Sequence, residues 1–350
     1  MRLSGPHTEE IRALHVIPGQ PEGSVMIFAR READSLRLAG IRVESFYLTS
    51  RTSLRTLVQE WRRFRRHVAE FRPHIVHAHF GTLTGLFCVA ASPVPVILTF
   101  RGTDLNPDPM LPRWRTDLGR FFSRISAIRA RRVVCVTEQL KRRLWWGRQK
   151  TCVMPGSVNF DLFQPMEREE ACELLGWEPQ TKRVLFNFGR FPVIKRPDLA
   201  ARAVDVARTI VGNIDLIQLD GNTPPETMPA VYNAVDCILV TSDWEGSPTI
   251  VREAMACNLP IVSVDVGDVA EMTQGAAPGT IAERDPAKLG QAVADILKSR
   301  ARSNGRSLIS HLNEEVVAGE VRRLYESALG REKAQAHRGM RSTSAEHLLP

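Results

Sequence analysis

Short apolar segments alternate with helix-forming segments along most of the chain, and this alternation constrains the fold more than any other feature. Nine apolar segments are typical of buried strands: 11–17, 41–48, 75–79, 94–100, 132–136, 184–188, 214–219, 237–241 and 261–264. Segments with helical spacing or helix start signals lie between them: 24–38, 54–71, 113–130, 197–210, 227–234 and 249–257. Strands that alternate with helices predict parallel sheets covered on both faces. We therefore expect an α/β chain of two doubly wound domains.

The length of 350 residues is sufficient for two domains that each bury a core. Segment 155–179 contains prolines and clustered acidic residues, and it is the natural linker. The expected domains cover residues 1–165 and 166–315. A C-terminal helix over 316–330 is expected to pack back toward the first domain, and the polar residues 331–350 are expected to form a disordered tail.

Charge is distributed unequally between the two halves. Residues 1–150 contain 26 basic and 12 acidic residues, whereas residues 151–350 contain 21 basic and 27 acidic residues. A positive first domain attracts phosphates, nucleic acid or an anionic membrane, although ordinary solubility is the plainer explanation. Nucleic acid is not expected as a partner, because no binding motif accompanies the charge and the second half is acidic.

Two basic segments with large aromatic residues, 55–72 and 141–148, are candidates for peripheral contact with an anionic membrane. A solvated helix face and two core tryptophans would explain the same residues. The longest apolar stretch, 86–100, contains two prolines and is too short to span a bilayer. We expect a cytoplasmic protein, and contact with the inner face of the membrane is a second expectation.

Several other classes of protein are disfavoured by what the sequence lacks. The polar N-terminal segment has no apolar core of a secretory leader. The six cysteines are scattered without the spacing of a zinc or redox motif. No Gly-x-Gly-x-x-Gly follows an expected strand, which disfavours a dehydrogenase.

The segment 241–253 (TSDWEGSPTIVRE) carries the most specific chemistry. A strand is expected to end at Thr241, and a helix to begin with Ser247 as its N-cap and Pro248 at its first position. Because the free N–H groups of a helix start bind anions, the turn from Gly246 to Thr249 is a candidate phosphate site.

Two acidic residues flank this turn, Glu245 before it and Glu253 within the helix. Carboxylates on both sides of an anion site suit a ligand with hydroxyl groups on either side of a phosphate, such as a sugar nucleotide. A loop acid and a solvated helix acid are the plainer alternatives. Arg190 and Lys195 follow another strand and could bind a diphosphate, although such residues are more often surface charges.

Four segments together resemble the retaining GT-B glycosyltransferases of family four: GRFPVIKRPD (189–198), YNAVD (232–236), SDWEGSPTIVREAMACNLPIVSVDVGDVAE (242–271) and HIVHAHFG (74–81). The resemblance covers residues from about 11 to 329. It implies two Rossmann-like domains facing across a cleft. It also implies transfer of a hexose-type sugar from a nucleotide-diphosphate sugar to a saccharide or lipid-linked acceptor, in polysaccharide or glycoconjugate synthesis.

The resemblance also implies roles for single residues on the donor side. Glu245 matches the glutamate that contacts the transferred sugar, and Glu253 matches the one that binds the ribose hydroxyls. Arg190 and Lys195 match the pair that neutralises the leaving diphosphate. Pro248 and its neighbours in the turn belong to the donor site.

On the acceptor side, Gly23 matches a glycine that lets the backbone approach the donor phosphates and the acceptor. His79 and Asp104 match positions that line the acceptor side of the cleft. No cofactor and no metal are expected, because protein cations replace a divalent ion and no Asp-x-Asp motif is present. His77 and His79 could suggest a metal pair, but no further ligand cluster is apparent in the sequence.

The chain departs from the family pattern in one place of consequence. Thr99-Phe-Arg101-Gly-Thr-Asp104 carries an arginine where the family commonly has a histidine. Arg101 could bind a phosphate or carboxylate of either substrate, or it could indicate a catalytically weak partner subunit. A nucleotide-sugar epimerase of the same fold is a further alternative.

Overall fold

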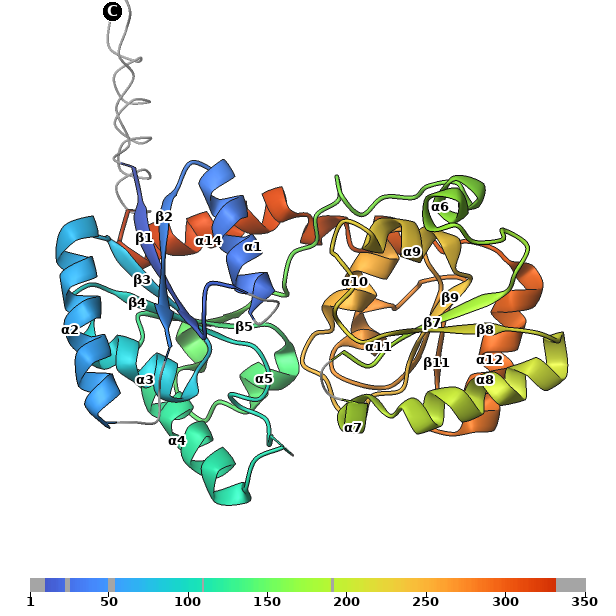
Figure 1. The fold of residues 1–350 in the computed structure, drawn as a ribbon. Helices are drawn as coiled ribbons and strands as arrows, with labels where there is room; N and C mark the ends of the chain where they lie inside the picture. Colours follow the sequence, from blue (N-terminus) through green and yellow to red (C-terminus); the bar gives the residue numbers. More distant parts are fainter. Residues whose placement is uncertain (1–9, 23–25, 50–53, 109, 190–191, 332–350) are drawn as a thin grey trace, which may run out of the picture. The chain divides into compact units, whose positions relative to one another are not determined.

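The computed structural model describes residues 10–22, 26–49, 54–108, 110–189 and 192–331. The chain divides into two compact units (Figure 1), which we call unit 1 (Met1–Met154 with Glu315–Pro350) and unit 2 (Pro155–Glu314). The division lies after Met154 rather than at residue 165. Residues 332–350, where a disordered tail was expected, lie outside the described residues, as does Ser24, the expected cap of the first helix.

Unit 1 is built on a parallel sheet in the order β2-β1-β3-β4-β5-β6. Its strands are β1 (Arg12–Pro18), β2 (Arg42–Leu48), β3 (Ile75–His79), β4 (Val96–Phe100), β5 (Arg132–Cys135) and β6 (Thr151–Val153). Its helices are α1 (Ile27–Leu38), α2 (Leu54–Phe71), α3 (Thr82–Ala91), α4 (Arg113–Arg129), α5 (Glu138–Arg142) and α14 (Glu314–Ala328). A short 3₁₀ turn covers Arg148–Lys150.

Each face of this sheet buries its own apolar layer, because successive strand residues point to opposite faces. One layer joins Leu14 and Val76 to residues of α2, α3 and α5. The other joins Ala13 and Ile75 to residues of α1 and α14. Figure 1 shows α14, the last helix of the described residues, against the same sheet as the first strand. Unit 1 is therefore closed by residues about 300 positions apart in the sequence.

Helices α3 and α4 approach closely because small residues face each other. A Cβ atom on Gly81 would lie 2.4 Å from the Ser123 hydroxyl oxygen, and one on Gly85 would lie 3.2 Å from the Ser126 Cβ atom. The Ser123 hydroxyl also accepts the Thr82 N–H at 2.7 Å. The buried side of α4 therefore consists of small, largely polar side chains.

Unit 2 contains a second parallel sheet, in the order β11-β10-β9-β7-β8. Its strands are β7 (Arg183–Asn187), β8 (Asp215–Leu219), β9 (Cys237–Val240), β10 (Ile261–Val264) and β11 (Thr280–Ala282). Its helices are α6 (Arg168–Leu175), α7 (Pro192–Lys195), α8 (Pro197–Val211), α9 (Met228–Ala234), α10 (Thr249–Ala256), α11 (Val269–Met272), α12 (Pro286–Ser299) and α13 (Gly305–Leu308), followed by a 3₁₀ turn at Ser310–Leu312. Helices α8 and α12 lie side by side (Figure 1), and a Cβ atom on Gly290 would lie 2.6 Å from the Ala203 carbonyl oxygen.

Both sheets confirm the predicted doubly wound α/β class. The expected strands agree with the structure to within about two residues at each end. The sequence analysis missed α3, β6, β11 and α12. Strands β6 and β11 have only three residues each, whereas α12 was overlooked although Asp285 caps it and Pro286 follows at its first position. Segment 155–179, expected to be a linker, also contains helix α6. Ala171 and Cys172 of this helix pack against Ala234 of α9.

The order of the strands places a switch point in each unit. In each sheet the first strand of the unit lies between the second and the third, so the chain winds first to one side and then to the other. Side chains at the carboxyl ends of these two central strands border a crevice in which doubly wound proteins bind ligands. The switch points lie between β1 and β3 in unit 1 and between β7 and β9 in unit 2. Within the described residues, no helix has the length and apolar character needed to cross a membrane.

Candidate functional site

The switch point of unit 2 brings together the predicted residues Lys195 and Glu245. Lys195 ends α7, just after β7, and Glu245 follows β9. The Lys195 ammonium group forms an ion pair with Glu245 Oε1. The Ser242 hydroxyl donates to the same carboxylate oxygen at 2.7 Å. Both charged side chains are only partly exposed, at 20% and 14%.

Backbone contacts fix the two loops that carry this pair. The Asp243 N–H donates to the Ile194 carbonyl oxygen at 2.8 Å, and the Thr241 hydroxyl donates to the Lys195 carbonyl oxygen at 2.8 Å. Arg284, which follows β11, donates to the carbonyl oxygens of Thr241 and Ser242, both at 2.8 Å. The sequence analysis missed Arg284, because only the pairing of β11 with β10 brings it near a loop 40 residues earlier.

The start of α10 differs from the expected cap. Helix α10 begins at Thr249 with Pro248 at the N-cap position, and no described side chain caps it. The Ser247 hydroxyl instead donates to Asp268 Oδ2 at 2.6 Å and accepts a hydrogen bond from Arg252. The prediction of Ser247 as N-cap is therefore wrong, since its hydroxyl is committed to a neighbouring loop. The first-turn N–H groups remain without a side-chain cap, which is the condition for anion binding.

The loop after β10 packs tightly on the candidate phosphate turn. Gly267 has a φ of 61°, and a Cβ atom there would lie 2.6 Å from the Gly246 carbonyl oxygen. A side chain at position 267 would therefore push the turn away. Burial raises the pKa of Asp268, although the Ser247 hydroxyl bond acts in the opposite direction.

Glu253 is not a solvated helix acid. Its exposed fraction is 8%, and Glu253 Oε2 accepts a hydrogen bond from the buried Tyr232 hydroxyl at 2.8 Å. Burying a carboxylate is costly unless its oxygens are bonded, so the structure holds this group in place at an energetic cost. Two predicted residues, Arg190 and Gly23, lie outside the described residues.

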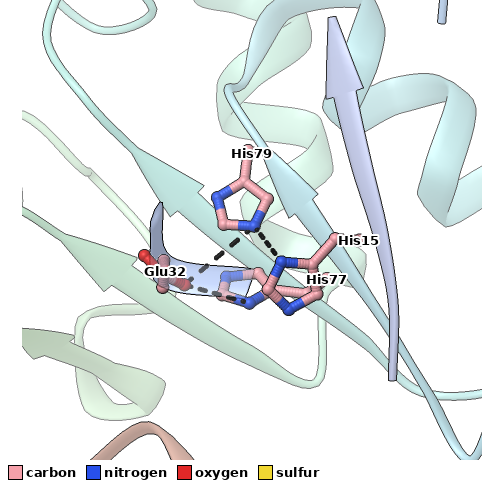
Figure 2. A group of neighbouring side chains, drawn as sticks. All are labelled: His15, Glu32, His77 and His79. Atoms are coloured by element: carbon pink, nitrogen blue, oxygen red, sulfur yellow. Dashed lines mark hydrogen bonds and ion pairs between the residues drawn. The ribbon is translucent and has the colours of Figure 1, made fainter. Parts of the chain in front are cut away.

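The switch point of unit 1 carries three buried histidines that sequence reasoning did not bring together. His15 lies on β1 and is paired in register with His77 on β3, and His79 lies two residues further along β3. Figure 2 shows the three rings next to Glu32 of α1. His15 Nδ1 lies 2.9 Å from His79 Nε2. The sequence signal was the pair His77 and His79; only the register of β1 adds His15.

These rings belong to one continuous chain of hydrogen bonds. Arg101 Nη2 lies 3.2 Å from His79 Nδ1, and His15 Nε2 lies 2.9 Å from the Tyr325 hydroxyl. The same hydroxyl lies 2.7 Å from His77 Nδ1. His77 Nε2 lies 2.7 Å from the Thr99 hydroxyl.

This chain of hydrogen bonds runs in one direction, because a guanidinium group can only donate. Arg101 donates to His79 Nδ1, so a neutral His79 carries its proton on Nε2 and donates to His15 Nδ1. His15 then donates from Nε2 to the Tyr325 hydroxyl. The hydroxyl donates to His77, whose Nε2–H donates to Thr99. Every ring nitrogen thus has one suitable partner as long as all three imidazoles are neutral.

Burial favours this neutral state. Desolvation lowers the pKa of His77 to about 3 and holds the pKa values of His15 and His79 well below 6.5. Desolvation also raises the pKa of the Tyr325 hydroxyl. A proton added to any of the three rings would set two donors against each other.

The predicted acceptor-side residues support this region from within. His79 and Asp104 are fully buried. Asp104 accepts the backbone N–H groups of Gly102 at 2.8 Å and of Gly81 and Arg101 at 3.1 Å. Burial raises the pKa of Asp104, and these N–H groups oppose the rise. Asp104 thereby fixes the loop after β4, and direct contact of either side chain with an acceptor stays a prediction.

Arg101 is paired rather than free. Its Nη2 atom lies 2.7 Å from Glu32 Oε2, and its side chain is 10% exposed over the Phe28 ring. An incoming anion would therefore compete with Glu32 for the guanidinium charge. Binding of a substrate phosphate or carboxylate by Arg101 stays a prediction.

The same cluster has the donor atoms of a metal site. One atom each from His15, Glu32, His77 and His79 lies within 4.8 Å of the others. Glu32 Oε1 lies 3.6 Å from His77 Nδ1 and 4.0 Å from His79 Nε2. An ion here would require the His79 proton to move from Nε2 to Nδ1, where Arg101 already donates. The donor set therefore fits the hydrogen-bonded chain better than an ion, and the expectation of no metal stays a prediction.

Replacing Tyr325 with phenylalanine should break this chain at its middle. The His15 Nε2–H group and His77 Nδ1 would lose their partner, and each buried unsatisfied group costs about 1–3 kcal/mol. We expect chemical denaturation to show a free energy of unfolding lower by roughly 2–4 kcal/mol. Tyr47→Phe is the matched control and should change stability by less than about 0.5 kcal/mol. Equal stability of both variants would contradict a stabilising role of this hydrogen-bonded chain.

Acid should destabilise the protein through the same histidines. Their pKa values are lowered in the folded state, so the unfolded chain binds more protons below pH 6.5. The stability that the neutral histidines contribute should be fully present above about pH 6.5. Below that pH the free energy of unfolding should fall by about 1.4 kcal/mol per pH unit for each histidine. Denaturation curves from pH 7.5 to 5 should show a shallower loss for His77→Gln than for the wild type. The control His311→Asn, at an exposed site, should keep the wild-type slope.

Comparison with protein families assigns both units. Residues 10–156 match the family described as a glycosyl transferase 4-like domain. Residues 182–299 match the glycosyl transferases group 1. The two matches cover the sheets of unit 1 and unit 2 in turn.

Curated relatives match parts of the chain. A D-inositol 3-phosphate glycosyltransferase from Mycobacterium marinum is 26% identical over 179 residues, which are 44% of this chain and 38% of the relative. An uncharacterized glycosyltransferase from Methanocaldococcus jannaschii is 22% identical over 72% of this chain and 75% of its own length. The chain thus spans less than half the length of the first relatives it matches.

Solved structures share the fold. Sucrose-phosphate synthase from Thermosynechococcus elongatus superposes with a TM-score of 0.76 at 19% identity, covering 92% of this chain and all of that one. Anabaena HepE in complex with UDP-glucose gives a TM-score of 0.67 at 14% identity, covering 91% and 100%. With its two parallel sheets and both family matches, the chain belongs to the group 1 glycosyltransferases of the GT-B fold.

Proposed function

We propose that the protein moves a hexose-type sugar from a nucleotide-diphosphate sugar to a saccharide or lipid-linked acceptor, with retention of the anomeric configuration. The observation that carries the proposal is the meeting of Lys195 and Glu245 beside the uncapped start of α10. This combination lies at the switch point of the unit 2 sheet, where doubly wound folds bind nucleotides. Anabaena HepE, which shares the fold, was solved with UDP and with UDP-glucose.

In this proposal the donor diphosphate binds at the start of α10 and at Lys195. The N–H groups of the turn from Gly246 to Thr249 and the positive end of the helix attract the phosphates. Lys195 exchanges its partner Glu245 for the diphosphate, and Arg190 adds a second cation. Because protein cations hold the leaving group, no divalent metal and no cofactor are required.

Glu253 would hold the nucleotide by its ribose. Glu253 and the Tyr232 hydroxyl are already bonded at 2.8 Å, so the carboxylate is oriented before the donor arrives. A fixed carboxylate accepts hydrogen bonds from two neighbouring hydroxyl groups at little further entropic cost. Glu253 therefore acts in donor binding rather than in the chemical step.

Glu245 would act on the transferred sugar. As the bond to the diphosphate breaks, the sugar becomes cationic and the diphosphate gains negative charge. A carboxylate released from Lys195 can then bind the sugar hydroxyls and stabilise the developing positive charge. If the acceptor attacks from the face of the leaving group, the diphosphate takes the acceptor proton, and no covalent nucleophile is needed.

Unit 1 would receive the acceptor at its own switch point. Arg101 and Glu32 offer a charged, partly buried pair there, and Asp104 fixes the loop that carries Arg101. Gly23, which follows β1 in the sequence, completes this side in the proposal. Curated relatives are named for D-inositol 3-phosphate, a compound with a phosphate group. An arginine at this position is compatible with an acceptor of that kind. We place the reaction in the cytoplasm, with a lipid-linked acceptor reached at the inner face of the membrane in polysaccharide or glycoconjugate synthesis.

A panel of nucleotide sugars tests the donor class. One or a few uridine, guanosine or adenosine diphosphate sugars should raise the melting temperature in a concentration-dependent way, because a ligand that binds only the folded state stabilises it. The effect should persist in EDTA. The absence of a shift with every nucleotide sugar at millimolar concentration would refute the proposal.

Variants of three site residues should separate binding from turnover. Lys195→Ala and Glu253→Ala should weaken donor binding measured by calorimetry, whereas Glu245→Ala should mainly lower turnover by about ten- to a hundredfold. Glu271→Ala, an exposed acid near the same loops, is the matched control. Equal donor affinity in all variants would contradict the assignment. Donor binding without any acceptor-dependent release of nucleotide would instead favour a catalytically weak partner subunit, and conversion of the free donor would favour an epimerase.

A further inference from the structure

Helix α4 exposes several large apolar residues and buries small, mostly polar ones. The buried residues are Thr116, Ser123, Ser126 and Ala127. The opposite face carries Trp114, Leu118, Phe121 and Ile128, which are 64%, 44%, 54% and 48% exposed. Spacings of three, four and seven residues place these four side chains in one stripe along the helix. A helix that only packs on a water-soluble domain shows the reverse pattern.

The small buried face has a structural cause. Helix α4 packs on the glycines of α3, and Ser123 and Ser126 fit against Gly81 and Gly85. Larger side chains would clash there. This contact explains the small residues on one face, but it does not explain the large apolar residues on the other.

Two tryptophans extend the exposed stripe. Trp145 and Trp146, in the turn after α5, are 65% and 64% exposed. They are therefore not the core tryptophans that the sequence allowed. The guanidinium group of Arg124 on α4 lies over the Trp145 ring at 4.0 Å, which joins the turn to the helix.

The apolar stripe lies within a strongly basic surface. Residues 110–150 contain 12 basic and two acidic residues. At 3.6 residues per turn, Arg113, Arg120 and Arg124 border one side of the stripe, and Arg115 and Arg129 border the other. Exposed aromatic residues between cations are typical of segments that lie in the interface of an anionic bilayer, where tryptophan is favoured.

The other candidate surface, on helix α2, is less apolar. Helix α2 buries Phe64, Val68 and Phe71 in the core of unit 1. Trp61, 39% exposed, packs edge-on against Phe87. The outer face of α2 exposes Val58 (53%) and part of Trp61 among its arginines. This apolar surface is smaller than the stripe of α4, so α4 is the stronger candidate for membrane contact than segment 55–72.

We propose that α4 and the Trp145–Trp146 turn form a docking surface for an anionic lipid bilayer. The helix lies parallel to the membrane, Trp114, Phe121 and the two turn tryptophans enter the headgroup region, and the bordering arginines pair with lipid phosphates. This inference deepens the proposed function and rests on it for the lipid-linked acceptor. Its test, however, requires no sugar transfer.

Vesicle flotation tests the surface with the full-length protein. Vesicles of phosphatidylcholine alone are compared with vesicles containing phosphatidylglycerol, at low salt and at 0.5 M salt. We expect binding to the anionic vesicles at low salt and at least a roughly tenfold lower partition coefficient for Trp114→Ala/Phe121→Ala. Leu174→Ala/Ile210→Ala removes similarly exposed apolar residues from unit 2 and should bind as the wild type does. High salt should weaken binding through charge screening.

A second pair of variants separates α4 from α2. Arg113→Gln/Arg115→Gln should weaken binding to anionic vesicles, whereas Arg62→Gln/Arg66→Gln on α2 should leave it nearly unchanged. Wild-type levels of binding in the Trp114/Phe121 variant, loss of binding in the α2 variant, or no preference for anionic lipid would each overturn the proposal. So would concentration-dependent self-association that the Trp114/Phe121 variant abolishes, because the stripe would then contact a second copy. Donor-induced thermal shifts, measured on the same variants, report separately on the proposed function.

Discussion

The strand order of the two sheets is the constraint on which the rest of the structure depends. In each unit the first strand lies between the second and third, and the chain changes winding direction at that point. The two loops that leave the central strands diverge there, so side chains at their carboxyl ends are left uncovered by the crossover helices. Lys195 and Glu245 lie in the segments that leave the central strands of unit 2, whereas the histidines of unit 1 lie on the central strands β1 and β3 themselves and are buried.

The polar groups at the two switch points are stabilised in different ways. In unit 2 the charges of Lys195 and Glu245 neutralise each other in an ion pair. Lys195 can exchange Glu245 for an anion that enters the site. Unit 1 uses neutral groups in a directed chain from Arg101 to Thr99, in which each imidazole has one donor and one acceptor role. A charged pair can be rearranged by a ligand, whereas a neutral chain is lost when one member is protonated. We infer that unit 2 is adapted to bind and release an anion and that the unit 1 cluster holds its sheet and α14 together.

Helix α4 shows that packing and surface demands can be met by different faces of one element. Its contact with α3 selects small side chains through the close approach of Gly81 and Gly85. Nothing in that contact selects Trp114 or Phe121, which cost solubility when exposed. The proposed contact of the outer face with a lipid bilayer would account for these two residues. The turn that carries Trp145 is joined to the same face by Arg124, so the surface spans two segments separated by about 20 residues.

The sequence by itself determined the α/β class and most strand positions, and it selected Lys195 and Glu245, which the structure brings into contact. Alternating apolar segments and helix start signals are local, and they can be read without knowing where distant residues lie. Other features depended on tertiary structure. The capping role expected for Ser247 failed because Asp268, brought near by β10, competes for its hydroxyl. The histidine chain needs the register of β1 with β3 and the return of Tyr325 on α14, and neither leaves a local pattern. The sequence could not predict the exposed stripe of α4 either. Helical spacing shows that a helix has an apolar face, but only packing decides whether that face turns inward.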